Sequence, residues 1–150
     1  MNKTYFNWST GKDAALALYK ILQDKNYTVQ KLVTTTNKDF DRVSMHGLRI
    51  SLLEAQIKSI GISLHKISFP AKVDMNVYNA TMQLEMNTLL KEGFTHSGFG
   101  DIFLEDLKNY RDKKLAEVGI QGVYPLWKKD TKTLLKELLD LGFKAITVCV

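Results

Sequence analysis

The chain has 150 residues, of which 45% are hydrophobic and 25% charged. This balance is that of one globular domain and excludes collagen-like, fibrous and disordered proteins. The net charge of +5 favours anionic ligands, from nucleotides to RNA, without choosing among them.

Strands and helices are predicted to alternate along the whole chain. The aromatic run 4–8 predicts a strand that ends in the turn Ser9-Thr10-Gly11, and alanine and leucine at helical spacing predict a helix over 13–22. Further strands are predicted at 29–36, 62–69, 95–99, 123–126 and 145–150, and further helices at 45–60, 76–91, 104–118 and 131–141. This order predicts the fold class α/β, a doubly wound, mainly parallel sheet with helices on both faces.

No stretch of the sequence reaches the roughly 20 apolar residues that a membrane span requires. No secretory signal is visible at the N-terminus either. We therefore expect a cytoplasmic protein without a membrane partner. In open parallel sheets ligands bind outside the carboxyl ends of the strands, where the strand order reverses. This rule selects the loops 9–13, 35–45, 69–74, 98–101 and 127–130.

The loop 9–13 joins the first predicted strand to a helix N-terminus, where free amides and the helix dipole favour an anion. Gly11 permits close approach of the backbone, and Lys12 adds a positive charge. The loop lacks the second glycine and the following Ser or Thr of a P-loop, and the chain has no G-x-G-x-x-G. A capping box formed by Thr10 and Asp13 explains the same residues without a ligand. Both interpretations remain open on these residues alone.

Several motifs in order carry a resemblance to a known family. The segment Ser9-Thr10-Gly11-Lys12-Asp13-Ala14 resembles the S-G-G-K-D-S pyrophosphate loop of the PP-loop ATP pyrophosphatases, with Thr10 for the first glycine and Ala14 for the last serine. Further matching motifs are Arg42-Val-Ser-Met-His-Gly47, Gly100-Asp-Ile-Phe-Leu-Glu-Asp-Leu107, Tyr110-Arg111 and Pro125-Leu126-Trp127. Over essentially its whole length the chain is similar to the diphthine-ammonia ligase family and its bacterial ATP-binding relatives.

The resemblance implies an adenine nucleotide alpha hydrolase-like fold that uses ATP and Mg²⁺. ATP would be cleaved between its α and β phosphates, and an adenylated carboxylate would be attacked by ammonia. The residues implied for ATP binding are Trp8, Ser9, Thr10, Gly11, Lys12, Asp13, Thr34, Thr35, Thr36, Met45, His46, Gly98 and Gly100. The implied catalytic residues are Lys12, Asp101 and Arg111; Glu105 and Tyr110 would bind the acceptor, and Asp13 and Asp101 the metal.

Two of these residues have alternative interpretations that need no ligand. Arg111 interrupts an apolar stripe on the predicted helix 104–118, so its guanidinium needs an anionic partner. That partner is either a ligand or one of the carboxylates Asp101 and Glu105. Asp101 follows a predicted strand, where it can hold Mg²⁺ or cap the next helix.

Two departures separate the chain from the family pattern. Ala14 lacks a hydroxyl that would bond a phosphate, and the relatives continue into a glycine- and glutamate-rich segment, whereas this chain ends at Val150. We expect either a natural truncation or a piece of a longer protein. The apolar end at 145–150 favours pairing with another copy.

Three functions are consistent with these features. The first is an ATP-dependent amide-forming ligase whose acceptor carboxylate is unknown. The second is a nucleotide sensor or partner module that has lost turnover, and the third is a tRNA-modifying PP-loop enzyme. The basic runs 108–114 and 128–136 lack an aromatic stripe, which weakens the case for a nucleic-acid partner.

Overall fold

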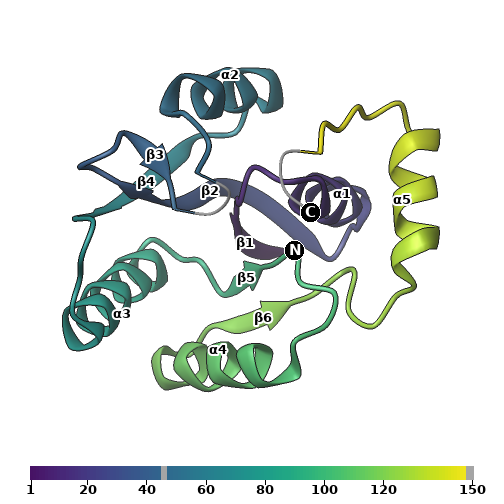
Figure 1. Ribbon diagram of the computed structural model, residues 1–150. Coiled ribbons are helices and arrows are strands. Elements are labelled where there is room, and N and C mark those ends of the chain that lie inside the picture. Colours follow the sequence, from purple (N-terminus) through teal and green to yellow (C-terminus); the bar gives the residue numbers. More distant parts are fainter. Residues whose placement is uncertain (45–46, 148–150) are drawn as a thin grey trace.

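The computed structural model describes residues 1–44 and 47–147 and shows a mostly parallel sheet flanked by helices (Figure 1). In chain order the elements are β1 (Asn2–Asn7), α1 (Lys12–Gln23), β2 (Tyr27–Asn37), β3 (Arg42–Val43), α2 (Ile50–Ile60), β4 (Leu64–Phe69), α3 (Met75–Lys91), β5 (His96–Gly98), α4 (Glu105–Val118), β6 (Gln121–Val123) and α5 (Thr131–Asp140). The α/β fold class expected from the alternation is confirmed.

The order of the strands puts a switch point between β1 and β5. Parallel pairing joins β4 to β2, β2 to β1, β1 to β5 and β5 to β6. The chain therefore moves outward from β1 through β2 to β4, and then crosses to the other side of β1 to add β5 and β6. In sheets of this kind the crevice outside the carboxyl ends of the two strands at the switch point is the usual ligand site.

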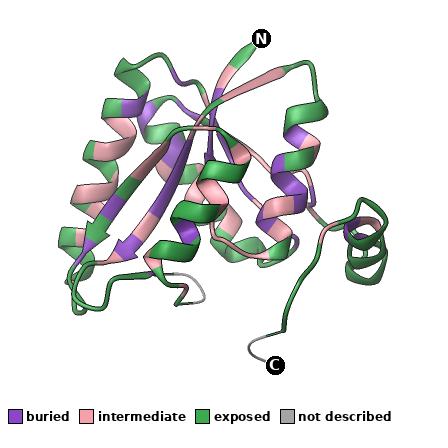
Figure 2. Cartoon of the chain, turned by 90° about the horizontal axis from the view of Figure 1, so that it is seen from above, coloured by how far each residue is buried: buried purple, intermediate pink, exposed green. Residues whose placement is uncertain are grey.

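The two faces of the sheet carry separate apolar cores. Phe6 and Leu32 pack with residues of α1, α2 and α5, whereas their neighbours Tyr5 and Val33 pack with residues of α3 and α4. This division follows from the strand geometry, because successive side chains point to opposite faces. Figure 2 shows the buried residues concentrated on the strands and on the sheet-facing sides of the helices. Among the described residues, no helix combines the length and apolar character needed to cross a bilayer.

The segment between β2 and α2 differs from its prediction. Its helix was expected from residue 45 but begins at Ile50, and the two-residue strand β3, which was not predicted, pairs antiparallel with the end of β2. Gly47 has a left-handed φ of 62°, and the amide of Val43 donates to the Leu48 carbonyl at 2.8 Å. This bond and the antiparallel bridge between Arg42 and Arg49 hold residues 47–49 against β3 instead of in a helix.

The last two predicted strands also differ. The predicted strand 123–126 lies at Gln121–Val123 in the structure, because Pro125 has no amide hydrogen and residues 124–127 form a turn with a bond from the Trp127 amide to the Tyr124 carbonyl. Of the predicted strand 145–150, residues 145–147 are irregular and Ile146 is 87% exposed. These three residues pair with no strand in the described part of the chain, and 148–150 lie outside it.

Candidate functional site

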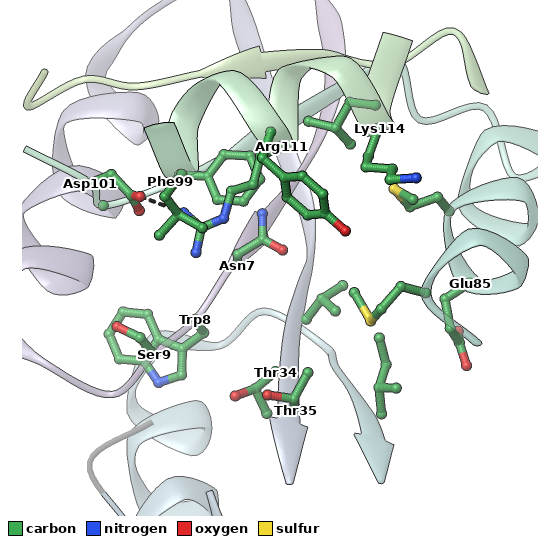
Figure 3. Close-up of a pocket in the computed structure, with 18 of the residues that line it drawn as sticks. Asn7, Trp8, Ser9, Thr34, Thr35, Glu85, Phe99, Asp101, Arg111 and Lys114 are labelled. Carbon is green, nitrogen blue, oxygen red and sulfur yellow. Dashed lines mark hydrogen bonds and ion pairs between the residues drawn. The ribbon is translucent and has the colours of Figure 1, made fainter. Parts of the chain in front are cut away.

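A cleft of about 1140 Å³ lies at the carboxyl ends of β1, β2 and β5. Its polar half is lined by the loop after β1, the end of β2 and residues 99–101, and its apolar half lies between α3 and α4. Figure 3 shows Asp101 and Arg111 on one wall, Trp8, Ser9, Thr34 and Thr35 on the other, and Asn7 between them. The cleft therefore lies where the switch-point rule predicted a ligand.

The loop after β1 presents free amides to this cleft. Gly11 is the N-cap of α1 and no side chain caps the helix, so the capping box that was one of the two interpretations of Thr10 and Asp13 is not formed. The first helical bond runs from the Ala15 amide to the Gly11 carbonyl at 3.1 Å, and within the described residues the amides of Lys12, Asp13 and Ala14 have no acceptor. Free amides at a helix N-terminus, beside the positive charge of Lys12, suit an anion such as a phosphate.

Thr10 adopts a backbone conformation that favours glycine. Its φ is 72°, in the left-handed region, which is a marked outlier for a β-branched residue. The left-handed conformation costs an L-residue roughly 1–2 kcal/mol. The pyrophosphate loop that this segment resembles has glycine at the same position, so the strain comes from a threonine in a backbone shape made for glycine.

We expect Thr10→Gly to stabilise the protein. Relief of the strained φ outweighs the roughly 0.5–1 kcal/mol that glycine loses through the greater freedom of its unfolded chain, leaving a gain of about 0.5–1 kcal/mol. Denaturant unfolding measures the difference. Thr10→Ala is the control, because alanine keeps the Cβ and with it the strain. A glycine variant less stable than the alanine variant contradicts the strain.

Gly100 allows the chain after β5 to contact the first turn of α1. A Cβ at this position would lie 3.0 Å from the backbone nitrogen and Cα of Ala14. Gly98 was also expected to face the crevice, but it is not among the residues that line the cleft. A Cβ there would lie 2.7 Å from the Phe6 ring and 2.8 Å from Ile21, so Gly98 is needed for packing in the core.

Arg111 of α4 forms an ion pair with Asp101, the internal carboxylate that was one of its predicted partners. The two side chains are 32% and 18% exposed, and the guanidinium carbon lies 4.9 Å from the centroid of the Phe99 ring. Asp101 does not cap the next helix, because the N-cap of α4 is Leu104. The pair holds one cation and one anion at the wall of the cleft.

An aromatic stack supports this pair from behind. Phe99 stacks on Tyr124 with ring centroids 5.1 Å apart, and the Tyr124 hydroxyl donates to Asp112 at 2.9 Å. Burial and this hydrogen bond raise the pKa of Tyr124 above the ordinary value for a tyrosine, so its hydroxyl remains a donor even in alkaline solution. The Phe99 ring beneath Arg111 is therefore held by a network that reaches from the residue after β6 to α4.

The other predicted site residues fall into three groups. Trp8, Ser9, Thr34, Thr35 and Tyr110 line the cleft, as do the loop residues Gly11, Lys12 and Asp13. Thr36 instead bonds Ser68 at 2.9 Å and lines a neighbouring pocket of about 680 Å³, and Glu105 is exposed at the start of α4. Met45 and His46 lie outside the described residues.

Two residues with a candidate role at this site were not predicted from the sequence. Asn7 at the end of β1 donates through Nδ2 to Ser97 Oγ and to the Gly98 carbonyl, both at 2.8 Å, and so ties β1 to β5 at the switch point. A polar residue at a strand end beside the loop was an available signal for Asn7. Gln56 of α2 contacts the loop after β1, and no local pattern singles it out.

Comparison with known proteins gives the family. A family model described as the diphthamide synthase N-terminal domain matches residues 2–122. The chain belongs to this family. The diphthamide synthase N-terminal domain family is a PP-loop family of ATP-using proteins, so the resemblance seen in the motifs is confirmed at this level. No curated protein matches the chain.

Two solved structures share the fold of this member of the diphthamide synthase N-terminal domain family. The first is a predicted subunit of tRNA methyltransferase from Methanocaldococcus jannaschii, which is 18% identical to this chain and superposes with a TM-score of 0.61. The match covers 91% of this chain and 75% of that protein. The second, the U34-tRNA thiolase NcsA from Methanococcus maripaludis with its 4Fe-4S cluster, is 19% identical with a TM-score of 0.56. The match covers 96% of this chain and 60% of the thiolase, and confirms the adenine nucleotide alpha hydrolase-like fold.

Proposed function

We propose that this chain is the ATP-binding part of an amide-forming ligase that splits ATP into AMP and pyrophosphate. The observation that carries the proposal is the uncapped N-terminus of α1, with Gly11 and Lys12 facing the same cleft as Arg111. Membership of the diphthamide synthase N-terminal domain family supports ATP as the ligand. The acceptor is a carboxylate, and ammonia is the nitrogen donor.

Several residues of the cleft have a role in this proposal. The free amides of the loop and Lys12 hold the β and γ phosphates, which leave together as pyrophosphate. Thr34 and Thr35 border the nucleoside, and Tyr110 lies on the acceptor side of the cleft. Arg111 stabilises negative charge near the α phosphate once the nucleotide draws it away from Asp101.

Asp13 and Asp101 fit a magnesium ion that enters with the nucleotide. Both line the cleft, while no cluster of three or more potential metal-ligating side chains occurs in residues 1–44 and 47–147. Mg²⁺ is commonly held by one or two carboxylates together with substrate phosphates, so two carboxylates suffice. The bound ion would neutralise charge on the phosphates.

The proposed reaction has two steps. An oxygen of the acceptor carboxylate attacks the α phosphorus, the bond from that phosphorus to the β-phosphate oxygen breaks, and pyrophosphate leaves. Ammonia then attacks the acyl carbon of the adenylate, AMP leaves with the electrons of the acyl–oxygen bond, and the nitrogen loses a proton. The products are an amide, AMP and pyrophosphate.

The labelled products of ATP test the ligase. We expect α-labelled ATP, incubated with the protein, Mg²⁺, ammonium and a host lysate as source of the acceptor, to yield labelled AMP. Lys12→Ala should lose this product, because its loop no longer binds the leaving pyrophosphate well. Chromatography of the nucleotides is the measurement. ADP as the main enzyme-dependent product contradicts cleavage between the α and β phosphates, and intact ATP despite measurable binding favours a nucleotide sensor.

A second candidate function is tRNA modification through an adenylated base. What favours it is that both similar structures are named for proteins that act on tRNA. The chain has one cysteine, which is too few for the thiolate set of a 4Fe-4S cluster. Replacing the lysate by purified bulk tRNA distinguishes the two functions: AMP formation that depends on tRNA favours the second, and AMP formation that depends on ammonium and a carboxylate favours the ligase.

A further inference from the structure

Gln56 of α2 bridges both ends of the turn Trp8-Ser9-Thr10. Its Oε1 accepts a hydrogen bond from Trp8 Nε1 at 3.0 Å, and its Nε2 donates to the Thr10 carbonyl at 3.3 Å. The bonded residues lie 48 and 46 positions away in the sequence, so only the folded chain brings them together.

Backbone bonds do not hold this turn. The Trp8 amide donates to the Val33 carbonyl at 2.8 Å, and the next backbone bond is that of the Ala15 amide to Gly11. Within the part of the chain that the structure describes, Ser9 and Thr10 take part in no backbone–backbone hydrogen bond. Thr10 also has the unfavourable φ of 72°. The Gln56 bond to its carbonyl therefore fixes a turn that would otherwise relax.

The indole of Trp8 sets the direction of the Gln56 amide. Trp8 is 5% exposed and belongs to the same apolar core as Leu53 of α2. An indole nitrogen is only a donor, so it must face the oxygen of Gln56 and leave the NH₂ group for the Thr10 carbonyl. The side chain has one orientation that satisfies both contacts.

The direction of the Thr10 carbonyl determines that of the next amide. In a planar trans peptide the N–H of Gly11 points opposite to the carbonyl oxygen of Thr10. Gln56 binds that oxygen, whereas Gly11 lines the cleft. Resting on the function proposed above, we infer that Gln56 is a positioning residue for ATP, which aims the Gly11 amide at the phosphates by holding the Thr10 carbonyl.

Gln56→Met tests this inference, because methionine has a similar length and makes neither hydrogen bond. We expect ATP affinity to fall about tenfold, the effect of losing one hydrogen bond and turning one amide away from a charged ligand. The Gly11 amide and Trp8 indole resonances of the ¹⁵N-labelled protein should both shift in the absence of ATP. The Trp127 indole serves as the internal reference, and calorimetry measures the affinity.

Two further variants separate the parts of the bridge. Gln56→Glu keeps an acceptor for the indole but loses the donor to Thr10, so the Trp8 resonance should stay near that of the parent while ATP affinity falls. Gln23→Met, at the other end of α1, controls for the new side chain and should change neither. Melting curves establish that all variants are folded.

The outcomes separate this inference from the proposed function. An unmoved Gly11 resonance in Gln56→Met overturns the inference whatever the nucleotide result, and so does a moved resonance with parental ATP affinity. A parent protein that binds no ATP overturns the proposed function and the ATP part of the inference. The two resonances then still decide whether Gln56 sets the direction of the Gly11 amide.

Discussion

Lys12→Ala is expected to weaken ATP binding by about 1.5–3 kcal/mol, the range for hydrogen bonds to charged groups, or roughly 10- to 150-fold. Lys12 is the first residue of α1, beside the free amides, and its Nζ lies 2.7 Å from the Asp13 carboxylate. A bound polyphosphate competes for that ammonium group. Removing the Lys12 ammonium group leaves the free amides as the main contacts for the outer two phosphates.

The stability of the protein should hardly change in this variant. The two side chains of the Lys12–Asp13 pair are 49% and 43% exposed, and solvent-screened pairs of this kind contribute little to stability. Alanine also has a high helix propensity, and a cation in the first helical turn opposes the helix dipole. Titration calorimetry gives the affinity, with Lys25→Ala beyond the other end of α1 as the matched control. Equal ATP affinity in parent and Lys12→Ala would remove the loop from the binding site.

Local patterns in the sequence predicted the fold and the place of the cleft. The helix α1 and the strands β1 and β2 follow from apolar periodicity, and such periodicity depends only on neighbours within a few residues. The alternation of elements then restricts the topology to a doubly wound sheet. Because ligand sites in these sheets lie at the switch point, the loop after β1 was predicted to be near a ligand without any distance being known.

Contacts that form only in the folded chain explain what the sequence did not predict. The course of residues 47–49 depends on their pairing with β3, and the role of Gly98 depends on Phe6 and Ile21 packing against it. The choice between a capping box and an anion site also stayed open, because the same loop supplies the hydroxyl and carboxylate of a capping box and the glycine and lysine of an anion site. The left-handed φ of Thr10 and the helix start at Lys12 distinguish the two only in the folded chain.

The sequence also left the partner of Arg111 open between a ligand and an internal carboxylate, and its pairing with Asp101 has a consequence for stability. Arg111→Ala should destabilise the unliganded protein by about 1.5–3 kcal/mol, because it removes a charged hydrogen bond and leaves the Asp101 carboxylate unpaired at the cleft wall. Both groups keep some contact with solvent, so the loss stays below the 3–5 kcal/mol typical of fully buried pairs. The melting temperature should fall by about 3–12 °C.

A double-mutant cycle shows whether the ion pair causes this loss. If it does, Arg111→Ala and Asp101→Ala together cost less than the sum of the two single changes by about 0.5 kcal/mol or more. Lys113→Ala, exposed on the same helix, is the control for losing a cation from α4. Additive losses would mean that Arg111 acts through its contact with the Phe99 ring instead of through Asp101. An unchanged melting temperature for Arg111→Ala would show that the arginine contributes nothing to the unliganded fold and is available to a ligand without cost.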